Sequence, residues 1–272
     1  MINKELVSQH FGKNAGTYDT YAVVQKAMGH TLGELVKKQG TFESILEIGC
    51  GTGYFTQILA TLFPQAQIVA TDISPAMLET AKKKLCNYPN ICYKVEDGEN
   101  LQLKESFQLV VSNAAFQWFS DYRQAFIAIN NRLMPGGCLA YATFGEDTFC
   151  ELHRSFAAAR SVLGLEQPSC HGPQFISLEE LRAIGRELDF FMDGFEERVQ
   201  EYFPTVADFL TSVKKIGANN AASSERMTVN RKLLMSMMES YEKTYRKQQQ
   251  IPATYHIIYG MHKKSNLLSR IS

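Results

Sequence analysis

The sequence of 272 residues lacks an excess of charge of either sign. Its 28 basic and 28 acidic residues give a formal net charge of zero. A chain without an overall positive field has no general attraction for nucleic acid, and an anionic partner must then be met by a local basic patch. We therefore expect no nucleic-acid partner.

Long apolar runs and metal-ligand patterns are missing as well. No stretch approaches the ~20 consecutive apolar residues of a membrane-spanning helix, and the first residues contain no apolar signal core. The six cysteines form no CxxC pair and have no histidine cluster near them. We expect reduced thiols in a cytoplasmic protein, with no membrane segment and no metal site.

Short apolar runs alternate with helix-forming segments from residue 44 to about residue 145. The runs show little polar alternation, which indicates parallel strands covered on both faces of a sheet. The connections are long enough for the right-handed crossovers of an α/β fold. Strands are expected at 44–49, 67–72, 91–97, 107–114 and 138–144, with helices at 54–63, 74–85 (Ser74 as N-cap) and 123–133.

The segments on either side of this core are mainly helical. A capping box of Ser177 and Glu180 opens one of the later helices, and two alternating patterns predict further strands, the second of which closes the sheet. The expected helices span 3–10, 22–38, 146–163 and 177–188, and the two strands span 195–203 and 253–262.

We expect a single domain over residues 1–272. Its expected parts are a helical extension over the glycine turn (1–40), a cofactor-binding core (41–145), the rest of the sheet with its flanking helices (146–204 and 251–264), and an inserted helical lid (205–250).

The most informative segment is ILEIGCGTGYFT, residues 45–56, in which an apolar run and an acid precede three glycines at alternate positions. Nineteen residues after Gly53, a second apolar run ends in Asp72. A glycine turn that opens a helix brings bare backbone against a ligand, and an acid at the end of the next strand suits ribose hydroxyls. The pattern predicts a nucleoside-cofactor site at the carboxyl ends of neighbouring parallel strands.

Two cofactor classes use such a turn, and Tyr54 distinguishes them. A dinucleotide fold needs a small residue at this place, where a tyrosine ring obstructs close packing of the helix. The sequence pattern E-x-G-x-G-x-G instead resembles the first motif of class I S-adenosylmethionine-dependent methyltransferases. The resemblance implies that Gly49, Gly51 and Gly53 leave open backbone for the methionine portion of the cofactor. It also implies that Glu47 lies near the ammonium group of that portion and that Asp72 binds the ribose.

Later strand ends fit the same resemblance. It implies contacts to the adenine or the rest of the cofactor from Ile73, Met77, Asp97, Gly98, Asn113 and Ala114, although Asp97 in the segment VEDGENL is also typical of a turn. Enzymes that methylate amino or amide nitrogens often carry Pro-Pro after the strand-four Asn or acid. This chain has Ala114-Ala115 there, which weighs against nucleic-acid bases and glutamine side chains as substrates. The single Trp118 is equally typical of core packing and of a pocket wall.

Longer segments narrow the family. FGKNAGTYDTYAVVQKAMGHTL, SNAAFQWFSD, RLMPGGCLAYATFGEDTFCEL, SVKKIGANN and TYHIIYGMHKK are similar to the malonyl-[acyl-carrier protein] O-methyltransferases of biotin synthesis, from about Phe11 to Lys264. The resemblance implies a Rossmann-like methyltransferase sheet, mostly parallel with an antiparallel last strand. It also implies methyl transfer from S-adenosylmethionine to the free carboxylate of a malonyl thioester on acyl-carrier protein or coenzyme A.

Other functions stay open at this point. Trans-aconitate methyltransferases share the core and part of the amino-terminal pattern, so a free polycarboxylate is an alternative acceptor, as is a phenolic or quinone ring. A nicotinamide-dependent oxidoreductase and a cofactor-binding regulator without catalysis are the alternatives from other classes.

The implied reaction requires few catalytic side chains. A carboxylate is already ionised at pH 7, so no general base, metal or covalent intermediate is expected, and rate should come from alignment and a lid that removes water. Tyr18, Arg123 and Arg198 are candidates for orienting the acceptor carboxylate. Aromatic packing of the extension is the alternative role of Tyr18, and solvated surface that of the arginines.

An acidic carrier protein calls for a basic rim near the lid. Each basic pair alone is typical of a solvated surface, but four of them lie in the carboxyl-terminal half, at Lys214-Lys215, Arg231-Lys232, Arg246-Lys247 and Lys263-Lys264.

Overall fold

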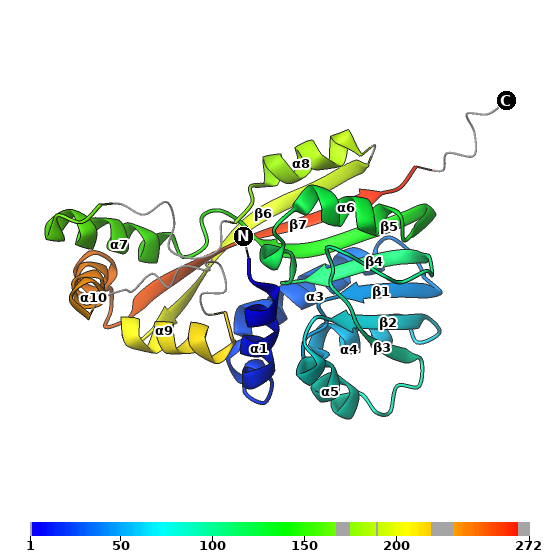
Figure 1. Ribbon diagram of the computed structural model, residues 1–272, viewed down its shortest axis with the longest axis horizontal. Helices are drawn as coiled ribbons and strands as arrows, with labels where there is room; N and C mark the ends of the chain where they lie inside the picture. Colours follow the sequence, from blue (N-terminus) through cyan, green and yellow to red (C-terminus); the bar gives the residue numbers. More distant parts are fainter. Residues whose placement is uncertain (1, 167–174, 189, 219–230, 266–272) are drawn as a thin grey trace.

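A seven-stranded sheet forms the centre of the protein (Figure 1), whose computed structural model describes residues 2–166, 175–188, 190–218 and 231–265. The strand order is β3-β2-β1-β4-β5-β7-β6. The strands are β1 (Ser44–Ile48), β2 (Gln67–Asp72), β3 (Ile91–Val95), β4 (Phe107–Asn113), β5 (Leu133–Phe144), β6 (Phe191–Phe203) and β7 (Ile251–Lys263).

Only β7 runs antiparallel to its neighbours β5 and β6, while the other pairs are parallel. The expected α/β sheet, mostly parallel with an antiparallel last strand, is therefore confirmed. Residues 251–260 of β7 are all buried, because this strand lies between two others and has helices on both faces. None of the helices in the described ranges has the length and apolarity needed to span a membrane.

Helices cover both faces of the sheet. On one face, α3 (Val23–Lys37) presents Met28, Leu32 and Val36 at helical spacing, and α4 (Tyr54–Leu62) adds Leu59 to the same apolar core. On the other face, α6 (Tyr122–Asn130) and α8 (Leu178–Glu187) bury a second core rich in phenylalanine. α5 (Pro75–Lys84) lies along β2 and β3.

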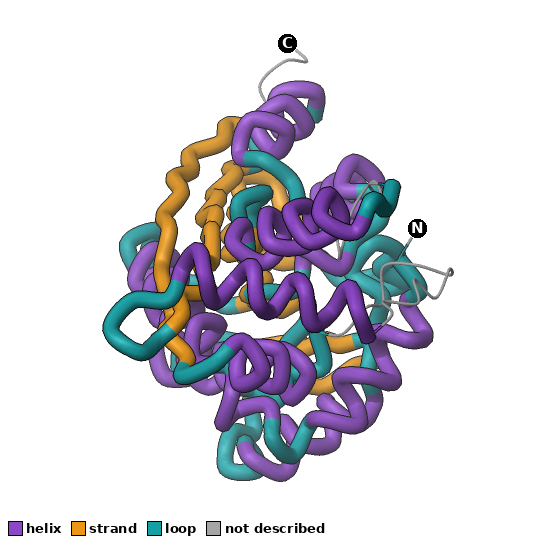
Figure 2. Tube along the Cα trace, turned by 90° about the vertical axis from the view of Figure 1, so that its left-hand side faces the viewer, coloured by secondary structure: helices purple, strands orange, loops and turns teal. Residues whose placement is uncertain are grey.

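The long β6–β7 ribbon extends past the other strands and carries a separate group of helices (Figure 1). These helices are α7 (Cys150–Leu163), α9 (Val206–Lys215) and α10 (Arg231–Tyr245). Figure 2 shows this group in front of the end of the sheet. The helices α9 and α10 fall in the expected insertion, part of which (219–230) lies outside the described residues, and its role as a lid stays a prediction.

The amino-terminal extension lies beside the carboxyl ends of the first strands. It consists of α1 (Lys4–Asn14), the short α2 (Tyr18–Tyr21) and the start of α3. Gly12 lies so close to α5 that an added Cβ would be 3.1 Å from Ser74 Oγ. The sequence did not predict α2, a four-residue turn with no capping side chain.

Several expected element boundaries were wrong. The helix expected at 123–133 ends at Asn130, because Leu133 already pairs with Phe107 in the sheet, and a register shift lets β5 continue through Pro135 and Gly136. Strand pairing likewise extends β6 back to Phe191. Further shifts are at α1, which continues to Asn14, at α7, which begins at Cys150, at β3, which ends at Val95, and at β7, which begins at Ile251.

The two predicted helix caps had different outcomes. The capping box of Ser177 and Glu180 is present with both of its hydrogen bonds. Ser74 occupies the N-cap position of α5, but its side chain makes no capping bond, and its N–H donates to Asp72 instead. The sequence also predicts a loop at 168–173, between α7 and α8, and this segment lies outside the described residues.

Gly260 on β7 is a sensitive point of the sheet. A Cβ added there would be 2.3 Å from Cζ and 2.4 Å from Oη of Tyr141, whose ring is fully buried. Overpacking of this kind costs about 1–3 kcal/mol. We expect Gly260→Ala to lower the melting temperature by several degrees in thermal unfolding followed by circular dichroism.

Gly16→Ala is the matched control, because nothing lies within 4 Å of an added Cβ at that position. Equal melting temperatures for the Gly260→Ala variant and the wild type would show that the strand relaxes without cost.

Candidate functional site

The glycine turn after β1 is built by backbone geometry that other residues rarely adopt. Gly49, Gly51 and Gly53 have φ values of +73°, +55° and +81°. The N–H groups of Gly49 and Cys50 both donate to Thr71 O at 2.8 Å, which ties the turn to β2. A Cβ on Gly49 would be 2.4 Å from that of Ala115. The turn therefore needs glycine for its conformation and, at Gly49, also for the close approach of the loop after β4.

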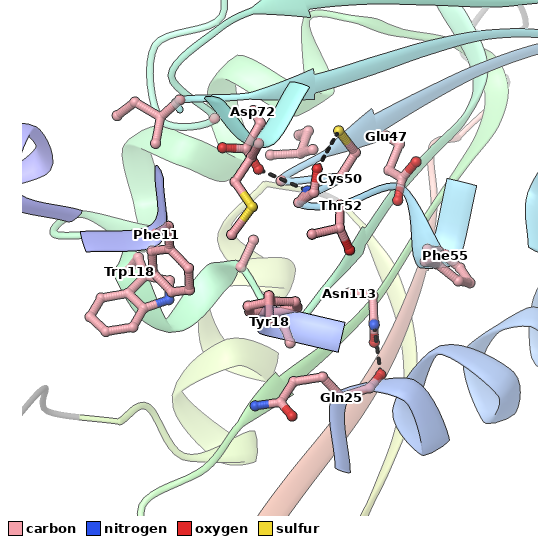
Figure 3. A pocket seen from close by; sticks show the side chains of 18 of the residues that line it. Phe11, Tyr18, Gln25, Glu47, Cys50, Thr52, Phe55, Asp72, Asn113 and Trp118 are labelled. Carbon is pink, nitrogen blue, oxygen red and sulfur yellow. Dashed lines mark hydrogen bonds between the residues drawn. The ribbon is translucent and has the colours of Figure 1, made fainter. Parts of the chain in front are cut away.

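Asp72 joins the turn to the end of the second strand. Its Oδ2 accepts the N–H of Gly51 at 2.9 Å and its Oδ1 accepts the N–H of Ser74 at 2.8 Å. Burial raises the pKa of this carboxyl to about 6, although the backbone hydrogen bonds act in the opposite direction. The side chain faces a cavity with part of its hydrogen-bonding capacity free (Figure 3).

Glu47 on β1 is a buried acid without full hydrogen bonding. It is 1% exposed, and its Oε2 has no hydrogen-bond partner among the described residues. Burial, and to a lesser extent the charge of Asp72, raises its pKa to about 8. A buried carboxyl in this state is costly by itself and favours a cationic ligand group beside it.

A cavity of about 960 Å³ lies over the turn (Figure 3). Of the eleven residues expected to bind a cofactor, all except Gly53 line it. Gly53 faces α5 instead, where a Cβ would be 3.0 Å from that of Ala81. Asn113 is held by a hydrogen bond from its Nδ2 to Gln25 O at 2.9 Å, and Ala114 adopts a left-handed φ of +55°. The cavity thus gathers the ends of β1, β2, β3 and β4.

The amino-terminal extension is fixed over this cavity by polar contacts that the sequence did not reveal. Lys4 Nζ lies 2.6 Å from Asp97 Oδ1 and also pairs with Glu99. Asp19 accepts from Thr52 Oγ1 at 2.5 Å and pairs with Lys84 Nζ at 2.8 Å. Ion pairs and hydrogen bonds of this kind between segments far apart in sequence have no local signal.

A second cavity of about 1230 Å³ adjoins the first. Its walls include Phe144 at the end of β5, Phe149 and Leu152 near the start of α7, and Leu210 and Val213 of α9. Five residues line both cavities, namely Phe11, Tyr18, Gln25, Ala114 and Trp118. Trp118 is therefore a wall residue, and its ring meets that of Phe11 edge-on at 5.4 Å.

Tyr18 is the one expected substrate-orienting residue that the fold places at these cavities. Burial, with the nearby charges of Asp72 and Asp19, raises the pKa of its hydroxyl. The hydroxyl therefore stays protonated at neutral pH and can donate a hydrogen bond. Its ring lies 6.1 Å from that of Phe11, so it also packs the extension.

Arg123 and Arg198 line neither cavity. Arg123 is 59% exposed and pairs with Glu187 of α8, with Nε 3.1 Å from Oε2. Arg198 Nη2 lies 2.7 Å from Asp147 Oδ2, and a second contact joins it to Glu196. In both cases the guanidinium already forms an ion pair with an acid from a distant part of the chain. The geometry therefore does not support a direct role of Arg123 or Arg198 in orienting an acceptor.

The basic pairs are also dispersed by the fold. Lys214 lines the second cavity and is exposed at its rim, with Lys215 next to it. Arg246 pairs with Glu242 on α10. Lys264 Nζ donates to Asn130 O and Leu133 O at 2.7 Å, where β5 begins, at the end of the sheet opposite to the cavities. This pair is therefore not part of a rim around them. Within the described ranges, no group of three or more His, Cys, Asp or Glu side chains could hold a metal ion.

Known proteins are similar to this chain over most of its length. A family model described as a methyltransferase domain matches residues 45–137. The chain is 40% identical to the malonyl-[acyl-carrier protein] O-methyltransferase of Priestia megaterium, over 98% of this chain and 100% of that protein. It is 39% identical to the protein of that name from Acetivibrio thermocellus, over 97% and 95% of the two chains. Among solved structures, YcgJ of Bacillus subtilis is similar in fold, with a TM-score of 0.61, 16% identity and coverage of 87% and 98%.

The raised pKa of Glu47 predicts how stability depends on pH. Between its ordinary value of 4.5 and about 8, the folded ligand-free protein holds a proton that the unfolded chain has released. The free energy of unfolding contributed by this group therefore falls as pH rises through that window. We expect the Glu47→Gln variant to gain melting temperature relative to the wild type between pH 5 and pH 9, measured by differential scanning fluorimetry.

Glu105→Gln provides the control, because a hydrogen bond from Lys94 holds the pKa of this exposed acid at about 2. Its difference from the wild type should stay constant over the same range. Parallel curves for Glu47→Gln and the wild type would contradict the assignment.

Proposed function

The chain belongs to the malonyl-[acyl-carrier protein] O-methyltransferase family, and from this membership we propose that it methylates the free carboxylate of a malonyl thioester on acyl-carrier protein. The methyl donor in this proposal is S-adenosylmethionine, and the product is the malonyl methyl ester that starts biotin synthesis. Methylation removes the negative charge, which would allow chain-elongating enzymes to treat the malonyl group as apolar.

The observation that carries the proposal is that two cavities adjoin each other and share lining residues. The residues of the first cavity suit the methyl donor. The orphaned Oε2 of Glu47 suits the ammonium of its methionine portion, and the glycine turn leaves open backbone beside it. Asp72 suits the ribose hydroxyls, and the adenine would meet Ile73, Met77, Asp97 and Gly98, with Asn113 and Ala114 at the border toward the acceptor. When bound, S-adenosylmethionine would supply a methyl group on a sulfonium sulfur. An acceptor oxygen would form a bond to the methyl carbon while the carbon–sulfur bond breaks and its electron pair stays on sulfur.

The described residues need only align the acceptor and exclude water. A malonyl carboxylate is ionised at pH 7 and requires no base. The Tyr18 hydroxyl, whose pKa is raised, acts as a donor rather than as a proton acceptor. The aromatic wall of Phe11 and Trp118 limits water at the junction of the cavities. We assign no residue as an acid or a base.

The second cavity suits the thioester arm of the acceptor. Its lining is mainly apolar and aromatic, and it reaches from the junction to Lys214 at the exposed rim. An acidic carrier protein would meet Lys214 and Lys215 there, so that the basic contact is local, as the zero net charge of the chain requires. Malonyl-coenzyme A carries the same arm and is a second form of the acceptor.

The direct test is transfer of labelled methyl groups. We expect the purified protein to methylate malonyl carrier protein in the presence of S-adenosylmethionine, with the ester identified by mass spectrometry. Malonyl-coenzyme A, trans-aconitate and carrier protein bearing acetyl are run in parallel, and the acetyl form, which has no free carboxylate, should stay unmodified. Turnover of trans-aconitate without turnover of malonyl carrier protein would replace the proposal with a free polycarboxylate methyltransferase.

The role of Asp72 can be tested by cofactor affinity. Asp72→Asn removes the charge that would accept ribose hydroxyls, and the loss of a hydrogen bond to a charged group costs roughly 1–3 kcal/mol. We expect the dissociation constant for S-adenosylhomocysteine to rise by about 5- to 150-fold in isothermal titration calorimetry.

Asp193→Asn on β6 is the control, since this exposed acid lines neither cavity. Because Asp72 also holds the glycine turn, melting temperatures are measured beside the titrations. Unchanged affinity in a folded Asp72→Asn protein would remove Asp72 from the cofactor site.

A further inference from the structure

A polar side chain with no hydrogen-bond partner in the described part of the chain lies at the junction of the two cavities, the region lined by the five residues that they share. Gln25 lies in the first turns of α3 and is only 8% exposed. Its backbone carbonyl accepts from Asn113 Nδ2, but its side-chain amide has no hydrogen-bond partner among the described residues. A side chain that lines two cavities and makes no hydrogen bond within the described residues can bond a ligand there.

The amide lies where an acceptor must meet the methyl donor. Gln25 lines the first cavity together with Asp72 and Glu47, and the second together with Phe149 and Leu210. In Figure 3 its amide group extends beneath Tyr18, away from the hydrogen bond that its carbonyl makes with Asn113. The reacting group of an acceptor that enters through the second cavity would reach the junction beside this amide.

None of the five residues shared by the cavities carries a charge. Lys4 and Lys26 line only the first cavity; Lys4 pairs with Asp97 and Glu99, and Lys26 lies over the Tyr54 ring. In the second cavity, burial lowers the pKa of His153, so its ring is neutral at pH 7, while Lys214 is at the exposed rim. The side-chain donors that the shared residues supply at the junction are therefore all neutral. They are the Gln25 amide, the Tyr18 hydroxyl and the indole N–H of Trp118, which is itself buried without a partner among the described residues.

Neutral donors suit a carboxylate that must act as a nucleophile. A guanidinium in a dry site would hold the acceptor charge strongly in the ground state and lose that interaction as the ester forms. An amide N–H orients one carboxylate oxygen at less cost to its reactivity.

We propose that Gln25 orients the acceptor, donating a hydrogen bond from its side-chain amide to the carboxylate that is methylated, with the Tyr18 hydroxyl beside it. This inference rests on the proposed function, because it requires a carboxylate acceptor. It assigns to neutral donors at the junction the role that the sequence suggested for Arg123 and Arg198.

The test compares two substitutions of similar size. Gln25→Met keeps the length of the side chain and removes the donor, and Gln25→Glu keeps the shape and adds a negative charge at pH 8.5. We expect Gln25→Met to lower kcat/KM for malonyl carrier protein by about 10- to 100-fold, and Gln25→Glu to lower it further because like charges repel. Affinity for S-adenosylhomocysteine and the melting temperature should change little in the methionine variant.

Gln124→Ala is the matched control, because this glutamine is exposed on α6 and lines neither cavity. If the role of Gln25 were only packing, the near-isosteric Gln25→Glu would be the milder change, and that order would overturn the inference, as would full activity of Gln25→Met. If the wild-type protein itself methylates no malonyl acceptor, the proposed function fails, and the inference fails with it.

Discussion

The carboxylate of Asp72 holds together the part of the structure on which the candidate site depends. It accepts N–H groups from Gly51 in the glycine turn and from Ser74 at the start of α5, so one side chain fixes β1, β2 and two helix starts relative to one another. The turn has few alternatives, since its three glycines have positive φ values and Gly49 lies against Ala115 in the loop that follows β4. The floor of the first cavity is therefore set before any ligand arrives.

This pre-formed floor has an electrostatic cost. Glu47 and Asp72 are both acids with raised pKa values, and burial is the main cause for each. A cationic ligand group would reduce that cost, because it favours the charged form of a carboxyl. Among the polar groups of the described residues that the fold leaves without a partner at the cavities are Oε2 of Glu47 in the first cavity and the side-chain amide of Gln25 at the junction. Donor and acceptor sites can thus be recognised from what the protein does not satisfy by itself.

The amino-terminal extension joins the two cavities. Phe11, Tyr18 and Gln25 come from it and line both, while Lys4 and Asp19 attach it to the loop after β3 and to the glycine turn. Since α9 closes the second cavity from the other side, the proposed acceptor site is enclosed by segments from the two halves of the chain. The sheet supplies the rigid base, and the helices around it shape this cavity.

The sequence alone determined the alternation of strands and helices and the position of the glycine turn, because apolar periodicity and the glycines act over short distances. The resemblance of its motifs to a known family added the antiparallel last strand and the expected cofactor residues, ten of which line the first cavity. It did not determine which charges find partners. Arg123 and Arg198 looked available for an acceptor carboxylate, yet Glu187 and Asp147, 64 and 51 residues away, occupy them. Gln25 gave no signal in its helix, and only the packed structure showed that its side chain lines both cavities without a hydrogen bond to the described residues. Whether a polar side chain finds a hydrogen-bond partner depends on contacts between distant segments of the chain. Tertiary structure therefore decided which side chains are available at the proposed acceptor site.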